Sequence, residues 1–184
     1  ALAALAVKTA FPEISEEIIE KGLSKTSLPA RFELIKKTRN FSGIPYLVLD
    51  GAHTPKSIKL TLETIKNANI KIDALLFACA QDKHSKEIAE LFLQSKVTDS
   101  KNFQKIFLTV PGNVKKSDLS EVENSFASAG LAFDSDSDYK KQIEKVLDFC
   151  NSNKKTLLIT GSFYLVAEVT KILGTRLETP QVIS

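Results

Sequence analysis

The sequence predicts an α/β protein built on a doubly wound, mainly parallel sheet with helices on both faces. Apolar runs recur along the chain, and segments with apolar residues at helical spacing stand between them. The runs are continuous rather than alternating, which indicates strands buried on both faces. Strands that alternate with helices favour a parallel sheet, and right-handed crossovers then cover both of its faces. A chain of 184 residues has room for one well-cored domain and a short appendage.

The N-terminal stretch predicts two short helices and a linker. Residues 1–8 read as the tail of an Ala/Leu-rich helix, and residues 14–21 form an amphipathic helix that ends at Gly22. Residues 24–29 are polar and end in Pro, which is typical of a linker between domains. We therefore expect the first 27 residues to lie outside the main domain.

The rest of the chain predicts alternating strands and helices. The expected strands are residues 31–36, 46–49, 73–80, 105–110, 131–133 and 156–160. The expected helices are residues 57–68, 85–94 and 117–129, followed by one that ends at residue 149 and one that ends at residue 173. Ser117 or Ser120 is the predicted N-cap of the third helix, and Asp136 or Ser137 that of the fourth. The segment beyond Gly174 is irregular.

Composition excludes several classes of function. The net charge of +3 is small and the lysines are spread along the chain, so we expect no nucleic-acid partner. No apolar stretch approaches the ~20 residues of a membrane span, so we expect no membrane partner either. Cys79 and Cys150 lie in apolar surroundings without metal-ligand or redox spacing, which predicts reduced core thiols in a cytoplasmic protein. No Cys/His cluster indicates zinc.

The most informative segment follows the strand at residues 46–49. Asp50 ends this apolar run, and Gly51 begins a tight turn that leads to Thr54 and Pro55, an N-cap followed by Pro at the first helical position. Asp50 and His53 therefore lie at the carboxyl edge of the predicted sheet, which is where open α/β sheets bind ligands.

Polar residues also follow the other predicted strands, at residues 81–84, 111–113 and 160–164. Neither Gly-x-x-x-x-Gly-Lys-Ser/Thr nor Gly-x-Gly-x-x-Gly occurs, so the chain has no loop of its own for a triphosphate or a dinucleotide. Gly161-Ser162 could open a nucleophile elbow, but Tyr164 stands where that motif needs Gly. A hydrolase triad is therefore not expected.

Four short sequence motifs, called words below, together resemble the C-terminal domain of folylpolyglutamate synthases and dihydrofolate synthases, members of the Mur ligase superfamily. Residues 50–55, Asp-Gly-Ala-His-Thr-Pro, resemble the word that opens this domain, with Thr54 where many members carry Asn. Residues 28–33, Leu-Pro-Ala-Arg-Phe-Glu, are similar to a Pro-Gly-Arg-Phe word, with Ala30 in place of Gly. Residues 82–84, Asp-Lys-His, are similar to Asp-Lys-Asp and depart at the third position. Residues 160–169 closely resemble the closing Gly-Ser-x-Tyr-Leu-Val-x-Glu-Val word.

The resemblance implies roles for individual residues. In the family, ATP lies between a central P-loop domain and this domain. Arg31 would contact the phosphates, Asp50 would accept hydrogen bonds from the ribose hydroxyls, and His53 would line the same nucleotide face.

Three more residues are weaker candidates. Lys83 would lie toward the γ-phosphate or acyl phosphate, although a solvated loop lysine explains it as well. Ser162, with Tyr164 beside it, would bind the α-carboxylate of L-glutamate, although Ser162 can equally be a plain N-cap and Tyr164 a core residue.

The activity implied is an ADP-forming ligase that uses ATP and Mg²⁺ to join L-glutamate to folate or dihydropteroate through an acyl phosphate. Residues 1–27 would then be the tail of the central ATPase domain with its linker, and residues 28–184 the C-terminal glutamate ligase domain. We expect the P-loop and the Mg²⁺ ligands to precede this chain, the chain alone to be inactive, and the whole enzyme to be a monomer. Two alternatives stay open: a Mur ligase acting on a cell-wall precursor, and a non-catalytic α/β module that binds a phosphate-bearing ligand.

Overall fold

One sheet organises the part of the chain that the structure, a computed structural model, describes: residues 2–26, 28–36, 41–81, 83–95, 97 and 103–174. Its strands run in the order β1-β2-β6-β3-β4-β5. Their bounds are β1 Glu33–Ile35, β2 Leu47–Asp50, β3 Ala74–Phe77, β4 Lys105–Leu108, β5 Asp134–Ser135 and β6 Leu157–Thr160. Strands β2 to β6 are mutually parallel, and only the edge strand β1 is antiparallel to its neighbour. The predicted doubly wound, mainly parallel sheet is therefore confirmed.

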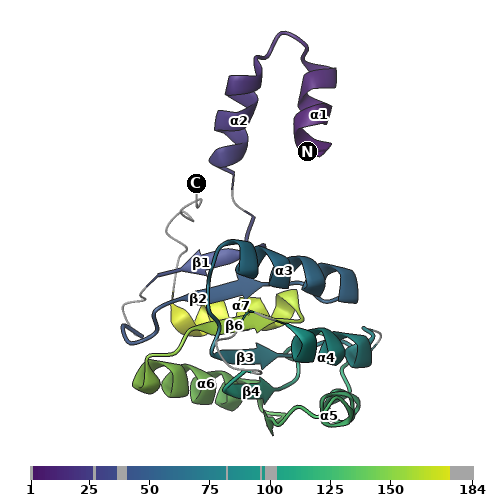
Figure 1. Cartoon of the computed structure of the whole chain (residues 1–184), viewed down its shortest axis with the longest axis vertical. Helices are drawn as coiled ribbons and strands as arrows, with labels where there is room; N and C mark the ends of the chain where they lie inside the picture. The colour runs from purple at the N-terminus through teal and green to yellow at the C-terminus, as the bar shows by residue number, and fades with distance from the viewer. Residues whose placement is uncertain are drawn as a thin grey trace.

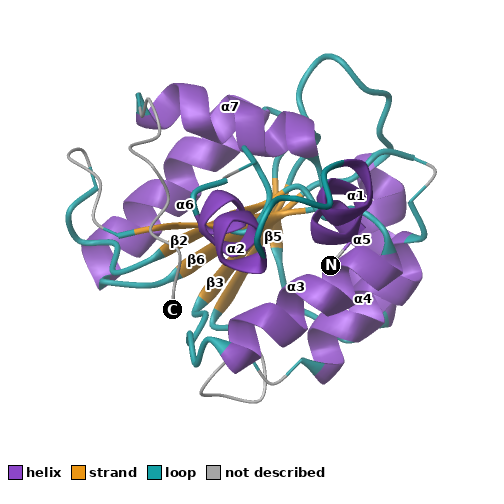
Figure 2. Ribbon diagram, turned by 90° about the horizontal axis from the view of Figure 1, so that it is seen from above, coloured by secondary structure: helices purple, strands orange, loops and turns teal. Residues whose placement is uncertain are grey.

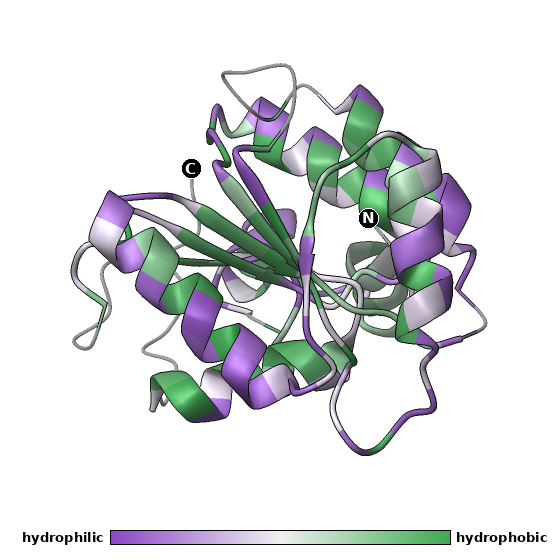
Figure 3. Ribbon diagram, turned by 90° about the horizontal axis from the view of Figure 1, so that it is seen from below, coloured by the Kyte–Doolittle hydropathy of each residue, from purple (hydrophilic) through white to green (hydrophobic). Residues whose placement is uncertain are grey.

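Helices cover both faces of this sheet (Figures 1 and 2). Their bounds are α1 Leu2–Ala10, α2 Glu16–Ser24, α3 Pro55–Asn67, α4 Ser85–Gln94, α5 Leu119–Ser128, α6 Tyr139–Asn153 and α7 Phe163–Leu173. Apolar residues of α3, α4 and α5 pack on one face of the sheet, and those of α6 and α7 pack on the other. The strand bodies are correspondingly apolar, whereas the outer faces of the helices are polar (Figure 3).

The register of the central strands aligns their carboxyl ends. β6 lies between β2 and β3, with Asp50 opposite Thr160 and Thr160 opposite Phe77. Leu108 of β4 is opposite Phe77 in turn. The turns that follow β2, β6, β3 and β4 therefore leave the sheet side by side, at the edge that we call the carboxyl edge.

Helices α1 and α2 project away from the sheet as a hairpin (Figure 1). Ser15 is the N-cap of α2 and its hydroxyl accepts a hydrogen bond from the Ile18 amide. The prediction that Gly22 ends this helix is wrong, because the helix continues through Gly22 to Ser24. No helix among the described residues is long and apolar enough to cross a membrane.

Three local predictions are corrected by the structure. Asp118 caps α5 and Asp138 caps α6, in place of the serines and the earlier aspartate that the sequence suggested. The strand expected at residues 131–133 is displaced to Asp134–Ser135, because Leu131 turns into the core and backbone pairing with β4 starts only at Asp134. The other strands lie within the predicted runs or one residue beyond them, and Cys79 and Cys150 are buried thiols as predicted.

Candidate functional site

Asp50 is the last residue of β2 and lies at the carboxyl edge with only 8% of its surface exposed. Its Oδ2 accepts a 2.6 Å hydrogen bond from the Thr61 hydroxyl of α3, and its Oδ1 accepts a 3.2 Å bond from the Ala52 amide. Burial raises the pKa of the Asp50 carboxyl, while these hydrogen bonds and the charge of Arg31 act in the opposite direction. Each carboxylate oxygen has a second lone pair, so the side chain can still accept a hydrogen bond from a ligand.

Arg31 approaches Asp50 from the turn that precedes β1. The residues on either side of it, Ala30 and Phe32, have left-handed backbone conformations with φ of 57° and 48°. The Ala30 carbonyl accepts a 2.8 Å hydrogen bond from the Gly51 amide, which ties this turn to the turn after β2. A left-handed Ala30 explains why the resembling families carry Gly at this position, since Gly adopts a positive φ without steric cost.

The guanidinium of Arg31 is exposed and lies over the ring of Phe163, 4.6 Å from its centroid. Phe163 is the first residue of α7, so the contact joins the turn before β1 to the turn after β6. Among the described residues, the ion pairs that form do not involve Arg31. Its exposed side chain at the carboxyl edge can therefore meet an anion from solvent.

His53 is half-buried in the turn between β2 and α3. Its Nδ1 lies 2.8 Å from the Gly51 carbonyl oxygen. Because a carbonyl can only accept, Nδ1 carries the hydrogen and Nε2 is left for another partner. The His53 ring also meets Phe163 edge to face, with centroids 5.7 Å apart. A reciprocal capping box between Thr54 and Ser57 holds the start of α3 below it.

A pocket of about 610 Å³ opens where the turns after β2, β3, β4 and β6 meet. Four of the predicted site residues line it: His53, Lys83, Ser162 and Tyr164. Lys115 and Lys116 line it as well, so three lysines face this space, and no carboxylate occurs among the described lining residues. Val114 and Tyr164 add apolar surface that is 69% and 39% exposed. The pocket therefore suits an organic anion with an aliphatic or aromatic part.

One predicted pocket residue, Ser162, also has a structural role. Ser162 is the N-cap of α7 and its hydroxyl accepts a 3.1 Å hydrogen bond from the Tyr164 amide, so the plain capping interpretation is correct for at least one of its lone pairs. Tyr164 is exposed rather than a core residue. Lys83 is half-buried, and its neighbour Asp82, part of the third word, lies outside the described residues.

The structure thus divides the predicted site into two adjoining groups. Arg31 and Asp50 do not line the pocket; they lie beside it, against Phe163 and the turn after β2. Sequence reasoning missed Phe163 as a functional residue, and it also missed Lys115 and Lys116. In the sequence, two adjacent lysines after a predicted strand were a signal that could have been used. In the structure, the Gln81 amide donates a 3.4 Å hydrogen bond to the Lys116 carbonyl, which brings the lysine loop to the end of β3.

Two glycines permit this crowding of turns. A Cβ added to Gly51 would lie 2.2 Å from the Phe163 ring, so the ring can pack there only against a glycine. Gly161 has a φ of +100°, and a Cβ on it would lie 2.3 Å from the Ala78 carbonyl oxygen. Both are needed for close approach at the carboxyl edge.

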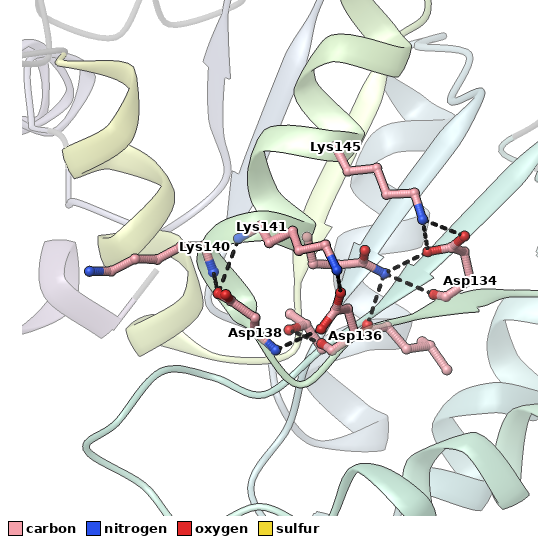
Figure 4. Close-up of polar contacts among 9 residues, drawn as sticks. Asp134, Asp136, Asp138, Lys140, Lys141 and Lys145 are labelled. Atoms are coloured by element: carbon pink, nitrogen blue, oxygen red, sulfur yellow. Dashed lines mark hydrogen bonds and ion pairs between the residues drawn. The ribbon is translucent and has the colours of Figure 1, made fainter.

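Another polar cluster, at the start of α6, is internally neutralised (Figure 4). Lys145 binds both carboxylate oxygens of Asp134 at 2.7 Å, and Lys141 binds Asp136 at 2.7 Å. These contacts hold the pKa of both carboxyls below the usual range. Asp138 is engaged as the α6 N-cap. Within the described ranges, no three His, Cys, Asp or Glu side chains are grouped so that they could hold a metal ion.

Comparison with known proteins finds a matching family model and similar curated proteins. The family model described as "Dihydrofolate synthetase, C-terminal domain" matches residues 34–172. The chain is 26% identical over 171 residues to the dihydrofolate synthase/folylpolyglutamate synthase of Bacillus subtilis (strain 168), a match that covers 90% of this chain and 35% of that protein. It is also 35% identical over 66 residues to the UDP-N-acetylmuramoyl-L-alanyl-D-glutamate--2,6-diaminopimelate ligase of Clostridium perfringens, covering 35% of this chain and 13% of that one.

A solved structure has the same fold. The chain superimposes with a TM-score of 0.75 on the folylpolyglutamate synthase of Mycobacterium tuberculosis complexed with ADP and AMPPCP, at 15% identity, covering 96% of this chain and 39% of that one. In each of these comparisons the chain spans well under half of the other protein's length.

Proposed function

Because the chain belongs to the family of dihydrofolate synthetase C-terminal domains, we propose that it serves as the C-terminal domain of an ATP-dependent ligase that joins L-glutamate to the carboxylate of a folate or of dihydropteroate. One observation carries the proposal: Arg31, Asp50 and His53 gather at the rim of a pocket that three lysines line. Such a site suits a polyanionic nucleotide beside a small anionic amino acid.

The nucleotide side consists of Arg31, Asp50 and His53. Arg31 binds the phosphates, where its fixed fork of donors offsets negative charge. Asp50 accepts hydrogen bonds from the ribose hydroxyls, and His53 lines the same face. The ADP and AMPPCP bound to the M. tuberculosis structure support a nucleotide as the ligand of this domain's relatives.

The pocket receives L-glutamate. Ser162 at the N-terminus of α7, with Tyr164 beside it, holds the α-carboxylate. Lys83 lies on the side of the γ-phosphate and of the acyl phosphate, and Lys115 and Lys116 face the second carboxylate. A dicarboxylate therefore matches the charge of the lining better than a neutral amino acid does.

The reaction has two steps. The γ-phosphoryl group of ATP passes to the folate or dihydropteroate carboxylate, which yields ADP and an acyl phosphate. The amino group of L-glutamate then attacks the acyl carbon, phosphate leaves, and the nitrogen loses a proton to give the amide. Steps of this kind depend on positioning and charge neutralisation, which is what fixed cationic groups at a sheet edge provide. We assign the Mg²⁺ ligands mainly to a preceding ATPase domain, as the resemblance to the family implies.

Residues 1–27 form the end of that preceding ATPase domain and its linker, and residues 28–184 form the ligase domain. The hairpin of α1 and α2 supports this division, since it stands apart from the sheet. It also carries large apolar side chains that are 41% to 63% exposed: Leu5, Phe11, Ile18 and Leu23. Apolar surface of this kind is suited to packing against further protein.

The alternative acceptor is a muramoyl nucleotide, and the 66-residue match to the C. perfringens ligase favours it. This match covers only 35% of the chain, compared with 90% for the B. subtilis protein. The folate ligase is therefore the better supported proposal.

The test is phosphate release by the full-length protein with ATP, Mg²⁺ and L-glutamate, to which dihydropteroate, tetrahydrofolate or a muramoyl nucleotide is added in turn. Release that depends on a pterin supports the proposal, and release that depends only on the muramoyl nucleotide replaces it with the alternative. Asp50→Ala, with Asp50→Asn as the variant of equal size, should lower kcat/KM for ATP about tenfold or more, the loss expected for hydrogen bonds to a charged group.

A second pair of variants tests the pocket in the same assay. Lys115→Gln with Lys116→Gln should raise the KM for L-glutamate about tenfold, because two charge-assisted contacts are lost. Lys66→Gln is the matched control, since Lys66 is exposed in the last turn of α3, away from the carboxyl edge. An unchanged KM for glutamate would remove these lysines from the acceptor site.

A further inference from the structure

Phe163 contacts residues of both parts of the candidate site. It is half-buried at the first position of α7 and lines the pocket together with Ser162 and Tyr164. The Arg31 guanidinium lies over the Phe163 ring, 4.6 Å from its centroid, and the His53 ring meets it edge to face at 5.7 Å. Phe163 therefore links Arg31, which is assigned to the nucleotide, to the pocket assigned to the amino acid.

The position of the ring is set by close packing. Gly51, which directly follows Asp50, lies so near that any Cβ there would come within 2.7 Å of three Phe163 ring atoms. The start of α7 is in turn held by the Ser162 cap and by the Gly161 amide, which donates to the Ala52 carbonyl at 2.8 Å. The aromatic face thus has one fixed location relative to the turn that contains Asp50 and His53.

The Phe163 ring is the described side chain on which the Arg31 guanidinium stacks. It is exposed, it lies in a short turn, and no described carboxylate forms an ion pair with it. Stacking on an aromatic ring restricts a guanidinium while leaving its edge donors free to bind an anion. A side chain that is ordered before the ligand arrives loses less conformational entropy on binding.

We propose that Phe163 is a positioning residue: its ring holds the Arg31 guanidinium and the His53 imidazole at the carboxyl edge and so sets how tightly the site binds ATP. The inference rests on the proposed function, since it takes ATP as the ligand of Arg31. It adds a role for a residue at the variable position of the Gly-Ser-x-Tyr word.

The experiment measures ATP binding to the full-length protein by titration calorimetry, without glutamate or folate. Phe163→Leu keeps an apolar side chain and removes the aromatic face, and it should raise the Kd for ATP about fivefold, within the range of cation–π contacts. Phe163→Tyr restores the face and should bring the Kd back to within about twofold of the wild-type value. Phe149→Leu is the control: Phe149 is also half-buried and packs on Phe107, far from Arg31 in the fold.

A double-mutant cycle separates positioning from general loss of structure. In an Arg31→Ala background, Phe163→Leu should weaken ATP binding far less than in the wild type, because the stacked partner is already gone. Multiplicative effects of the two substitutions, or a Kd unchanged by Phe163→Leu, would overturn the inference. Failure of the wild-type protein to bind ATP would instead overturn the proposed function, so the two failures are distinguishable.

Discussion

Glu33 is a buried acidic side chain in the strand that follows Arg31. It is 3% exposed, one of its oxygens accepts a hydrogen bond from the Ala30 amide, and its other oxygen has no partner among the described residues. Burial raises its pKa above the ordinary value of 4.5. Its one hydrogen bond supports the left-handed Ala30, and so the backbone that presents Arg31.

The raised pKa makes a prediction about stability. The folded chain binds a proton at Glu33 more tightly than the unfolded chain, so stability should fall as the pH rises from the unfolded pKa through the folded one. Glu33→Gln keeps the acceptor for the Ala30 amide and removes this titration. The stability of the variant relative to the wild type should therefore rise as the pH increases above the ordinary Glu pKa of 4.5.

Urea unfolding of the wild type and the variant across that range measures the difference. Asp50 also has a raised pKa, but it is present in both proteins and cancels in the comparison. Identical pH dependence of the two unfolding midpoints would show that Glu33 does not titrate differently in the folded chain.

At the residue scale, the roles of the predicted site residues stay predictions. Their positions, however, can be compared with the structure. Asp50 and His53 were located by one word of sequence, because a polar residue after a buried strand must lie at the sheet edge. Phe163 could not be found this way. Its function depends on contacts with Arg31, which is 132 positions away in the chain, and an aromatic residue at the start of a helix carries no signal of its own.

At the scale of the elements, the helix boundaries show how local signals compete. Around α6 the sequence offers aspartates at 134, 136 and 138, each of which could cap a helix. Lys145 and Lys141 bind the first two, and Asp138 is left to accept from the Lys140 and Lys141 amides. The lysine contacts of Asp134 and Asp136 therefore decide which aspartate caps α6, since the three aspartates have the same intrinsic preference for the N-cap position.

The turn between β6 and α7 gives a stability prediction. Gly161→Ala should destabilise the fold by about 3 kcal/mol, because a left-handed conformation and a clash with the Ala78 carbonyl oxygen add up. Gly130→Ala is the matched control: Gly130 has a φ of +76° with nothing within 4 Å of the added Cβ, so only strain of about 1 kcal/mol is expected. Thermal or urea unfolding measures both, and equal losses would mean that the close contact relaxes at little cost.

At the scale of the whole molecule, the lack of a phosphate-binding loop in the 184 residues has a direct consequence. Arg31 and the pocket lysines can neutralise only part of the charge of a triphosphate. The chain on its own should therefore show no ATP turnover above background, whereas the full-length protein should release phosphate. Turnover by the purified chain at a rate comparable to that of the full-length protein would contradict the assignment of the P-loop to a preceding domain.

The alternation of buried apolar runs with helical segments determined the fold class, because that pattern can bury its apolar surface only in a layered α/β sheet. The same pattern determined that the turns after the strands share one edge. Tertiary structure alone decided the strand order, and with it that β6 lies between β2 and β3. This order brings Phe163 against Gly51, Arg31 and His53. The central strands β2, β3, β4 and β6 are all largely apolar, so local sequence cannot decide which of them are neighbours. The packing of the helices on both faces decides it.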